Sequence, residues 1–425
     1  MPPQASPHKE LPRIPALDGF RAYAILIVVV LHLLLVSGAL VGENRTAFGI
    51  AVWGIAGNVL DVFFILSGFV LFLPVAVRGG LGDLRTFAIG RAARLLPAYW
   101  LALAASLAVV VLVDGYATPP VGDVLVHAGA LQMPARLFDP GMPVGFGANG
   151  ALWMVSIVVG LYCVVPLVAR PYLRHPLLGL GIAAGVTVAW KLAVTEGTGA
   201  FVWLEGGSAQ PWLMELTAID QLPAWSFSFA LGMTGAWGYV RLQPMLERED
   251  TRRWAVALAT ISGVAFAACA YAYGHDAAAI NGAVSGSHAR TDTVLGLGYS
   301  SSRALLMAAV VAGPLWLQRP FTLAPVRRLS DLSYGLYLIH LPVAFALGAA
   351  LLGLATDGSP TTVALWLTIV LSVSLLYAHL TRRHIERPLV DWARRLGDGK
   401  DDEGDAAAAG MTPAGWPAIH KPSRS

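Results

Sequence analysis

The sequence predicts an all-α protein, a polytopic membrane helical bundle with about ten transmembrane helices. The chain of 425 residues is 56% hydrophobic and only 13% charged, whereas a typical soluble domain carries roughly 25% charged residues. Several apolar runs exceed about 18 residues, the length that indicates a membrane-spanning helix. The arginines gather in alternate connections between these runs. Together these observations place most of the chain in lipid.

Ten apolar segments are expected to cross the membrane. They lie at about 17–37, 50–77, 95–113, 151–169, 176–195, 221–240, 254–273, 304–317, 330–354 and 361–380. The second is long and the eighth is short, so their ends are the least well defined. An alternative adds a short span near 121–133, which would reverse the orientation of every later helix.

The two ends of the chain differ from this apolar domain, which we expect to cover residues 17–390. A polar leader, residues 1–16, precedes the first apolar run. That run is longer than the core of a signal peptide and contains a histidine, so we interpret it as a retained helix. The tail 397–425 has low complexity and is expected to be disordered.

The distribution of positive charge tests the ten-span arrangement. With the N-terminus in the cytoplasm, the inward loops 78–94, 170–175, 241–253 and 318–329 hold 13 arginines in 48 positions. The five outward loops hold 4 in 110 positions: Arg45, Arg136, Arg290 and Arg303. Because positive residues concentrate on the cytoplasmic side, both termini are expected there, in a multi-pass protein of the plasma membrane.

Charge and cysteine content exclude several classes of function. The net charge of +3 is small, so a nucleic-acid partner is not expected. Cys163 and Cys269 both lie inside apolar runs. They offer neither a disulfide framework nor a zinc site, and small core residues of this kind are common. The lipid bilayer is the first predicted partner, and no metal site is expected.

The segment RAYAILIVVVLH, residues 21–32, carries an arginine at one end and a histidine at the other. Eleven residues make about three helical turns, so Arg21 and His32 share one face roughly 16 Å apart. A charge inside the bilayer costs about 2.5–3.5 kcal/mol, and histidine exchanges protons near neutral pH. On this helix alone, a catalytic role and simple snorkelling or interhelical bonding are equally plausible.

Four further polar residues strengthen the catalytic interpretation. Asp61 lies deep in the second span and requires a partner or a proton, and His32 is a candidate partner by depth. His340, ten residues into the ninth span, is either functional or a core histidine. Arg91 and Arg94 share one face where the third span enters the membrane. They indicate either a clamp for a phosphate-bearing ligand or ordinary positive-inside charge.

Taken together, these segments resemble the membrane acyltransferase-3 family of integral-membrane O-acyltransferases, over residues 15 to about 390. The first helix matches through PALDGFRAYAILIVVVLH and the second through LDVFFILSGFVL. A cytoplasmic Arg-x-x-Arg motif, a late Ser-Tyr-x-x-Tyr-x-x-His-x-Pro helix and a closing Glu-Arg-Pro motif follow in order. The positions that match are Arg21, His32, Asp61, Ser67, Arg91, Arg94, Ser333, Tyr334, Tyr337, His340, Pro342, Glu386, Arg387 and Pro388.

One motif departs from the family pattern. In ALWMVSIVVGLYCVVP the positions of Trp153, Ser156, Tyr162 and Pro166 align, but Val158 stands where the family usually carries an acidic residue. This helix contains no carboxylate at all. The departure leaves open a different acceptor or a loss of catalysis.

The resemblance implies an enzyme that takes an acyl group from cytoplasmic acyl-CoA, with acetyl-CoA expected. The implied acceptor is a hydroxyl of a surface carbohydrate, a glycolipid or a glycosylated natural product. Arg21, Arg91 and Arg94 would hold the phosphates of the donor. His32 would be the general base, oriented by Asp61, with direct transfer and an acyl-histidine intermediate both open. Acyl-CoA is a co-substrate, and no bound cofactor is expected.

Two other functions remain open from the sequence. A transporter or flippase would use the same histidine and aspartate to relay protons or bind a solute. A catalytically silent homologue would bind lipid or a partner, as the valine at position 158 suggests.

Overall fold

The protein is described by a computed structural model that covers residues 14–40, 46–139, 141–195, 218, 220–246, 248–279, 289–393 and 395–396. Within these ranges all regular secondary structure is helical. Nine stretches in the described residues are long and apolar enough to cross a membrane. The predicted class, a polytopic helical bundle, is therefore confirmed. The predicted tail and residues 1–13 of the predicted leader lie outside the described residues.

The long helices follow the predicted spans closely, beginning with α1, which starts two residues earlier than predicted. They are α1 (Pro15–Val36), α2 (Ala47–Ala56), α3 (Asp61–Arg78), α4 (Leu84–Leu112), α7 (Trp153–Arg174), α8 (Pro176–Thr195), α11 (Ser226–Leu246), α12 (Glu249–Ala279), α13 (Ala289–Ala312), α15 (Ala324–Val343), which continues into η5 (Ala344–Leu351), and α16 (Pro360–Thr381), which continues into η6 (Arg382–Glu386). The counterpart of the sixth predicted span, α11, is not among the nine apolar stretches.

Short helices fill the connections between these elements. They are α5 (Val121–Ala128), α6 (Gln132–Arg136), η1 (Val144–Gly147), η2 (Gly150–Leu152), η3 (Leu222–Trp225) and α14 (Leu315–Thr322). The elements α5 and α6 have 8 and 5 residues, too few to cross a bilayer. The alternative span near 121–133 is therefore not formed.

Two predicted span boundaries are wrong. The eighth span begins at residue 289 as α13 rather than at 304, and the second is divided into α2 and α3 by residues 57–60. Asn58 in this break has a φ of 49°, a left-handed conformation that asparagine tolerates better than most residues. Both differences have one physical cause, a buried arginine that is described with the site.

The most buried of the long apolar stretches contain α3, α15 and α7, and α3 packs tightly on α11. A Cβ at Gly68 would lie 2.1 Å from the carbonyl oxygen of Phe229, and one at Gly232 would lie 1.9 Å from that of Ile65. Only glycine permits this approach of two main chains, a common device in membrane bundles. Asp61 on α3 and His340 on α15 therefore lie on two of the most enclosed helices.

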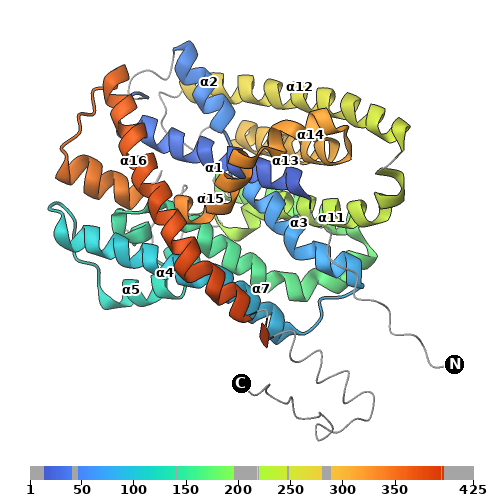
Figure 1. Cartoon of the computed structure of the whole chain (residues 1–425), viewed down its shortest axis with the longest axis horizontal. Coiled ribbons are helices and arrows are strands. Elements are labelled where there is room, and N and C mark those ends of the chain that lie inside the picture. Colours follow the sequence, from blue (N-terminus) through green and yellow to red (C-terminus); the bar gives the residue numbers. More distant parts are fainter. Residues whose placement is uncertain are drawn as a thin grey trace, which may run out of the picture.

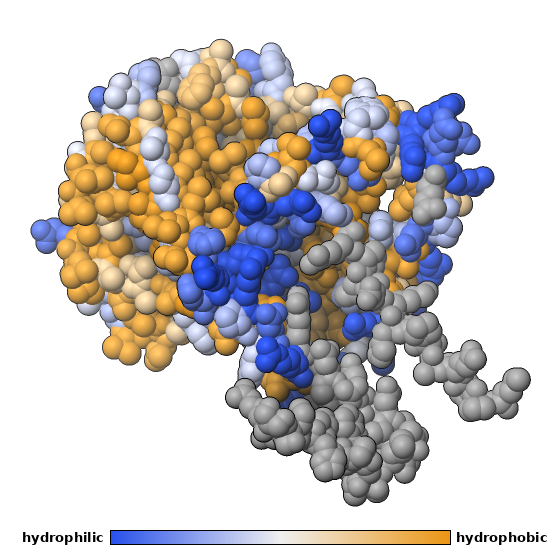
Figure 2. Space-filling view, viewed as in Figure 1, coloured by the Kyte–Doolittle hydropathy of each residue, from blue (hydrophilic) through white to orange (hydrophobic). Residues whose placement is uncertain are grey.

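The periphery is apolar. Helices α8, α12 and α16 expose large side chains such as Leu177, Trp254 and Leu376, and α2 lies beside α12 at one edge of the bundle (Figure 1). Figure 2 shows a broad apolar surface on this face, with a polar patch over the C-terminal part of α16. We call the end of the bundle with the α3–α4 turn (79–83) and the α7–α8 turn (His175) the basic end.

Candidate functional site

The centre of the candidate site is a pair of histidines on α1 and α15. Nδ1 of His32 lies 2.8 Å from Nε2 of His340, and the two rings are nearly parallel, with an interplanar angle of 10°. His340 is fully buried and His32 is half-buried. Residues 308 positions apart in the sequence are thus joined through two side chains, and both are predicted site residues.

The hydrogen bonds fix the protonation of both rings. Nδ1 of His340 lies 2.7 Å from the carbonyl oxygen of Tyr337, and because a carbonyl can only accept, this nitrogen carries a proton. In the neutral ring Nε2 of His340 is then an acceptor, so Nδ1 of His32 donates to it. This leaves Nε2 of His32 with a lone pair, and no described residue binds it. The tautomer follows from the heavy-atom geometry.

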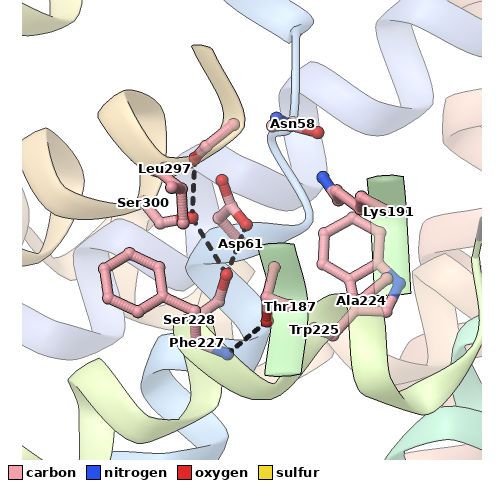
Figure 3. A pocket seen from close by; sticks show the side chains of 11 residues that line it. Asn58, Asp61, Thr187, Lys191, Ala224, Trp225, Phe227, Ser228, Leu297 and Ser300 are labelled. Atoms are coloured by element: carbon pink, nitrogen blue, oxygen red, sulfur yellow. Dashed lines mark hydrogen bonds between the residues drawn. The ribbon is translucent and has the colours of Figure 1, made fainter. Parts of the chain in front are cut away.

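Asp61 does not orient this histidine pair, which corrects the predicted partnership with His32. Asp61 lies at the same depth as His32, about 26 Å from the basic end when measured along α3. Its Oδ1 accepts a hydrogen bond of 2.7 Å from the hydroxyl of Ser228 (Figure 3). Its Oδ2 lies 3.5 Å from Nη1 of Arg303. Depth alone therefore could not identify the partner of the carboxylate.

Arg303 was predicted to lie in an outward loop. It is instead buried within α13, and its side chain binds the residues of the break between α2 and α3. Its guanidinium donates to the carbonyl oxygens of Gly57 at 2.6 Å and Asn58 at 2.5 Å. These carbonyls directly follow the C-terminal end of α2, where partial negative charge gathers, and that of Asn58 also accepts the backbone N–H of Asp61 at 2.9 Å. The arginine thus explains both wrong span boundaries, because it is a charged residue inside a helix and it stabilises a helix break.

The three predicted donor-binding arginines come together at the basic end. Arg21 interacts electrostatically with Arg94 and Tyr162, and Arg91 interacts with the same two residues. Arg94 also acts on the carboxyl group of Glu386. The structure therefore gathers Arg21, Arg91, Arg94, Tyr162 and Glu386 from four helices. Three guanidinium groups in one place form a suitable site for a polyanion.

Three predicted residues of α15 make structural contacts. The hydroxyl of Ser333 donates to a carbonyl oxygen of its own helix at 2.7 Å. The hydroxyl of Tyr334 donates to the carbonyl oxygen of Leu95 at 2.8 Å, and that of Tyr337 donates to the carbonyl oxygen of Ala151. The two tyrosines thus tie α15 to α4 and to η2, and hold the helix that carries His340.

The remaining predicted residues lie outside the histidine pair. The hydroxyl of Ser156 accepts a hydrogen bond of 3.3 Å from the backbone N–H of Met133. Ser67 is half-buried on α3, and Arg387 is exposed just after η6. Val158 is buried in the apolar core. Within the described residues, no cluster of three or more His, Cys, Asp or Glu side chains could hold a metal ion.

Two charged residues that the sequence reasoning did not single out lie near the outer part of the site. Lys191 is the only lysine between residues 10 and 399, and it lies in the apolar helix α8, where a charge normally indicates function. Asp220, in the connection before η3, interacts electrostatically with Lys191, Arg136 and Tyr337. Burial raises the pKa of Asp220 to about 6, although the two cations oppose this shift.

Comparisons with known proteins agree with the predicted resemblance. The family model described as "Acyltransferase domain", that of the acyltransferase-3 family, matches residues 14–379. The chain is 24% identical over 398 residues to "Peptidoglycan O-acetyltransferase OatA" of Listeria monocytogenes, an alignment that covers 88% of this chain and 56% of that protein. It is 36% identical over 104 residues to "Putative peptidoglycan O-acetyltransferase YrhL" of Bacillus subtilis, covering 24% of this chain and 14% of that protein.

The chain therefore spans only a little over half the length of the first of these relatives. No solved structure matches the chain.

Proposed function

The chain belongs to the acyltransferase-3 family, and on that premise we propose that it is a membrane O-acyltransferase. The proposed reaction moves an acyl group, with acetyl the expected one, from acyl-CoA to a hydroxyl of a carbohydrate. The observation that carries this proposal is the chain of hydrogen bonds from the Tyr337 carbonyl through His340 to His32. Peptidoglycan is the first acceptor to test, because both relatives carry it in their names.

The histidine pair provides the proton transfers of this reaction. As the acceptor oxygen attacks the thioester carbonyl, Nε2 of His32 takes the proton of the hydroxyl group. The C–S bond then breaks, and the imidazolium returns that proton to the leaving thiolate. Nδ1 of His32 keeps its own proton and its hydrogen bond to His340 throughout. His340 therefore acts as a positioning residue. A base of this kind contributes about 10²–10⁴-fold in rate.

The arginine cluster supports acyl-CoA as the donor. Arg21, Arg91 and Arg94 would hold its phosphates at the basic end, with bidentate hydrogen bonds from guanidinium groups. His32 lies roughly 16 Å further along α1, a separation that the long pantetheine arm would span. We propose that the basic end faces the cytoplasm, in the plasma membrane, with both termini on that side.

The test is transfer by the purified protein. With [¹⁴C]acetyl-CoA and soluble peptidoglycan fragments, we expect label in the carbohydrate, released by mild alkali as an ester would be. A panel of glycolipids and glycosides in place of the fragments identifies the acceptor class. Absence of transfer to every acceptor would remove the proposed function and favour a silent homologue.

A single variant tests the assignment of His32 as the general base. His32→Ala is expected to lower transfer by at least 10²-fold, while its elution as a folded monodisperse species and its helical circular dichroism stay unchanged. His379→Ala, which removes an exposed histidine of α16, is the matched control. If His32→Ala kept full activity, the general-base assignment would be wrong.

One observation favours a second candidate, translocation of a solute or protons. The break between α2 and α3 lies in the bundle interior beside a buried carboxylate, an arrangement common in transporters. The protein would be reconstituted in vesicles that contain a pH-sensitive dye. Proton flux coupled to a solute, without acyl transfer, would support this candidate. Acyl transfer without such flux would exclude it.

A further inference from the structure

A polar pocket lies beside the histidine pair, between the α2–α3 break, α8, η3, α11 and α13. Its lining includes Asn58, Asp61, Lys191, Trp225 and Ser300 (Figure 3). Its interior has room for about one water molecule or one hydroxyl group, within a hollow of about 220 Å³ that is partly open to the outside. None of the five lining residues has a role in the proton transfers described above.

The pocket offers both donors and acceptors of hydrogen bonds. A Cβ at Gly296 would lie 3.0 Å from the amide nitrogen of Asn58 and 3.1 Å from the ammonium nitrogen of Lys191. Both donors therefore converge over this glycine, which leaves room for them. Asp61 and Ser228 also line the pocket. The serine hydroxyl bonds to the carboxylate, but the oxygen atoms of both residues keep further lone pairs that can accept. A group that both donates and accepts, such as a sugar hydroxyl, can bond to these oxygen atoms and to the two nitrogen donors.

An aromatic wall gives the pocket a fixed shape. The ring of Trp225 stacks on Phe64 at a centroid distance of 4.7 Å and lies 5.6 Å from the ring of Trp153. The ammonium of Lys191 lies 6.0 Å from the centre of the Trp225 ring. A few polar groups placed against aromatic side chains are typical of small-molecule sites.

Charge in and around the pocket is balanced. Three acidic and three basic side chains alternate through electrostatic contacts, in the order Arg303, Asp61, Lys191, Asp220, Arg136, Asp139. A site for an anion would carry an excess of cations. Balanced charge instead suits an uncharged ligand with many hydroxyl groups.

The pocket is linked to the proposed reaction centre through Asp220, which interacts electrostatically with both Lys191 and Tyr337. The ring of Tyr337 lies 6.0 Å from that of His340. Asp220 thus lies between the pocket and the helix that carries the buried histidine.

We propose that this pocket and Asp220 form a subsite that anchors the carbohydrate acceptor, away from the hydroxyl that reacts. This inference rests on the proposed function, because the acceptor class comes from there. Lys191 and Asp220 are positioning residues for the acceptor, which they hold against the outer side of the histidine pair. Binding energy from such a remote part of a substrate is available to orient the reacting group.

The kinetic test separates the acceptor from the donor. Lys191→Met is expected to raise KM for the soluble peptidoglycan fragment about tenfold, the loss of one charged hydrogen bond, with KM for acetyl-CoA within about twofold of wild type. Asp220→Asn is expected to act in the same way. Arg241→Met, on α11 and outside the pocket, is the control. A variant of Lys191 that changes only KM for acetyl-CoA would overturn the proposal.

A second measurement does not depend on catalysis. Because Lys191 is the only lysine between residues 10 and 399, its reaction with an amine-selective reagent can be read from one peptide by mass spectrometry. The fragment is expected to slow this labelling at least threefold, and acetyl-CoA is expected to leave it unchanged. Labelling that is equal with and without the fragment would overturn the subsite. Protection by the fragment in a protein that transfers no acetyl group would support the subsite while removing the proposed function.

Discussion

Two polar centres are buried at similar depth in this bundle, and they differ in whether all of their polar atoms have a hydrogen-bond partner. In the Asp61–Arg303 centre, the arginine is engaged by the carboxylate and by main-chain carbonyl oxygens, and the carboxylate also binds Ser228. In the histidine pair, Nε2 of His32 has no partner among the described residues. The first arrangement satisfies buried charge and holds a helix break, whereas the second keeps one basic atom available.

The comparison teaches how to separate structure from chemistry among buried polar residues. An ion pair whose hydrogen bonds all end on the protein is expected to matter for folding. A chain of neutral rings that ends in a free lone pair is expected to matter for reaction. The three predictions below test this division, from the largest expected effect to the smallest.

The largest effect is expected from Arg303→Ala. The substitution leaves Asp61 and the carbonyl oxygens of Gly57 and Asn58 without the guanidinium, and breaking a buried pair costs about 3–5 kcal/mol. The free energy of unfolding, measured by denaturant titration in detergent, should fall by that amount. Arg253→Ala removes an exposed pair with Glu249 and should cost below about 1 kcal/mol. Similar stability of the two variants would show that Arg303 does not hold the helix break.

An intermediate effect is expected from substitutions of His340. His340→Leu removes the acceptor that orients His32 and should lower kcat about 10²-fold, with KM for both substrates little changed and stability retained. His340→Gln keeps an acceptor oxygen near the position of Nε2 and should recover about tenfold of that loss. Equal kcat values for the leucine and glutamine variants, measured in the labelled transfer assay, would contradict a positioning role.

The smallest effect is expected at the basic end. Arg91→Ala should raise KM for acetyl-CoA about tenfold, because one charge-assisted contact to phosphate is lost, and kcat should change little. Arg85→Ala, an exposed arginine earlier in the same helix, is the matched control. If both variants raised KM for acetyl-CoA equally, the arginine cluster would act only through its overall electrostatic potential and not through direct contact with phosphate.

Hydropathy and charge predicted most of the fold. Apolar runs located each long helix, and the arginine bias placed Arg21, Arg91 and Arg94 at the same end, where they converge around Tyr162. A pattern of this kind fixes the position of each helix along the membrane normal. It does not fix the rotation of a helix about its axis, so depth alone pairs His32 with Asp61, whereas the structure pairs it with His340.

Arg303 and Lys191 show why the rest could not be predicted. A charged residue lowers the hydropathy of its surroundings, so the eighth span was started after Arg303 instead of around it. Lys191 lies inside a long apolar run, so the hydropathy of its neighbours conceals its charge. It is the only lysine in the helical domain, and this signal in the sequence could have identified it as a candidate.

The glycine contact between α3 and α11 has a consequence for access to the pocket. Because the two main chains touch at Gly68 and Gly232, the wall that carries Asp61 and Ser228 must shift as one unit. A sugar group that enters the pocket beside this wall can gain space only on the other flank. That flank is α8, a peripheral helix with exposed apolar side chains such as Leu177 and Ile182, so admission of the acceptor would be sensitive to the lateral pressure of the surrounding membrane.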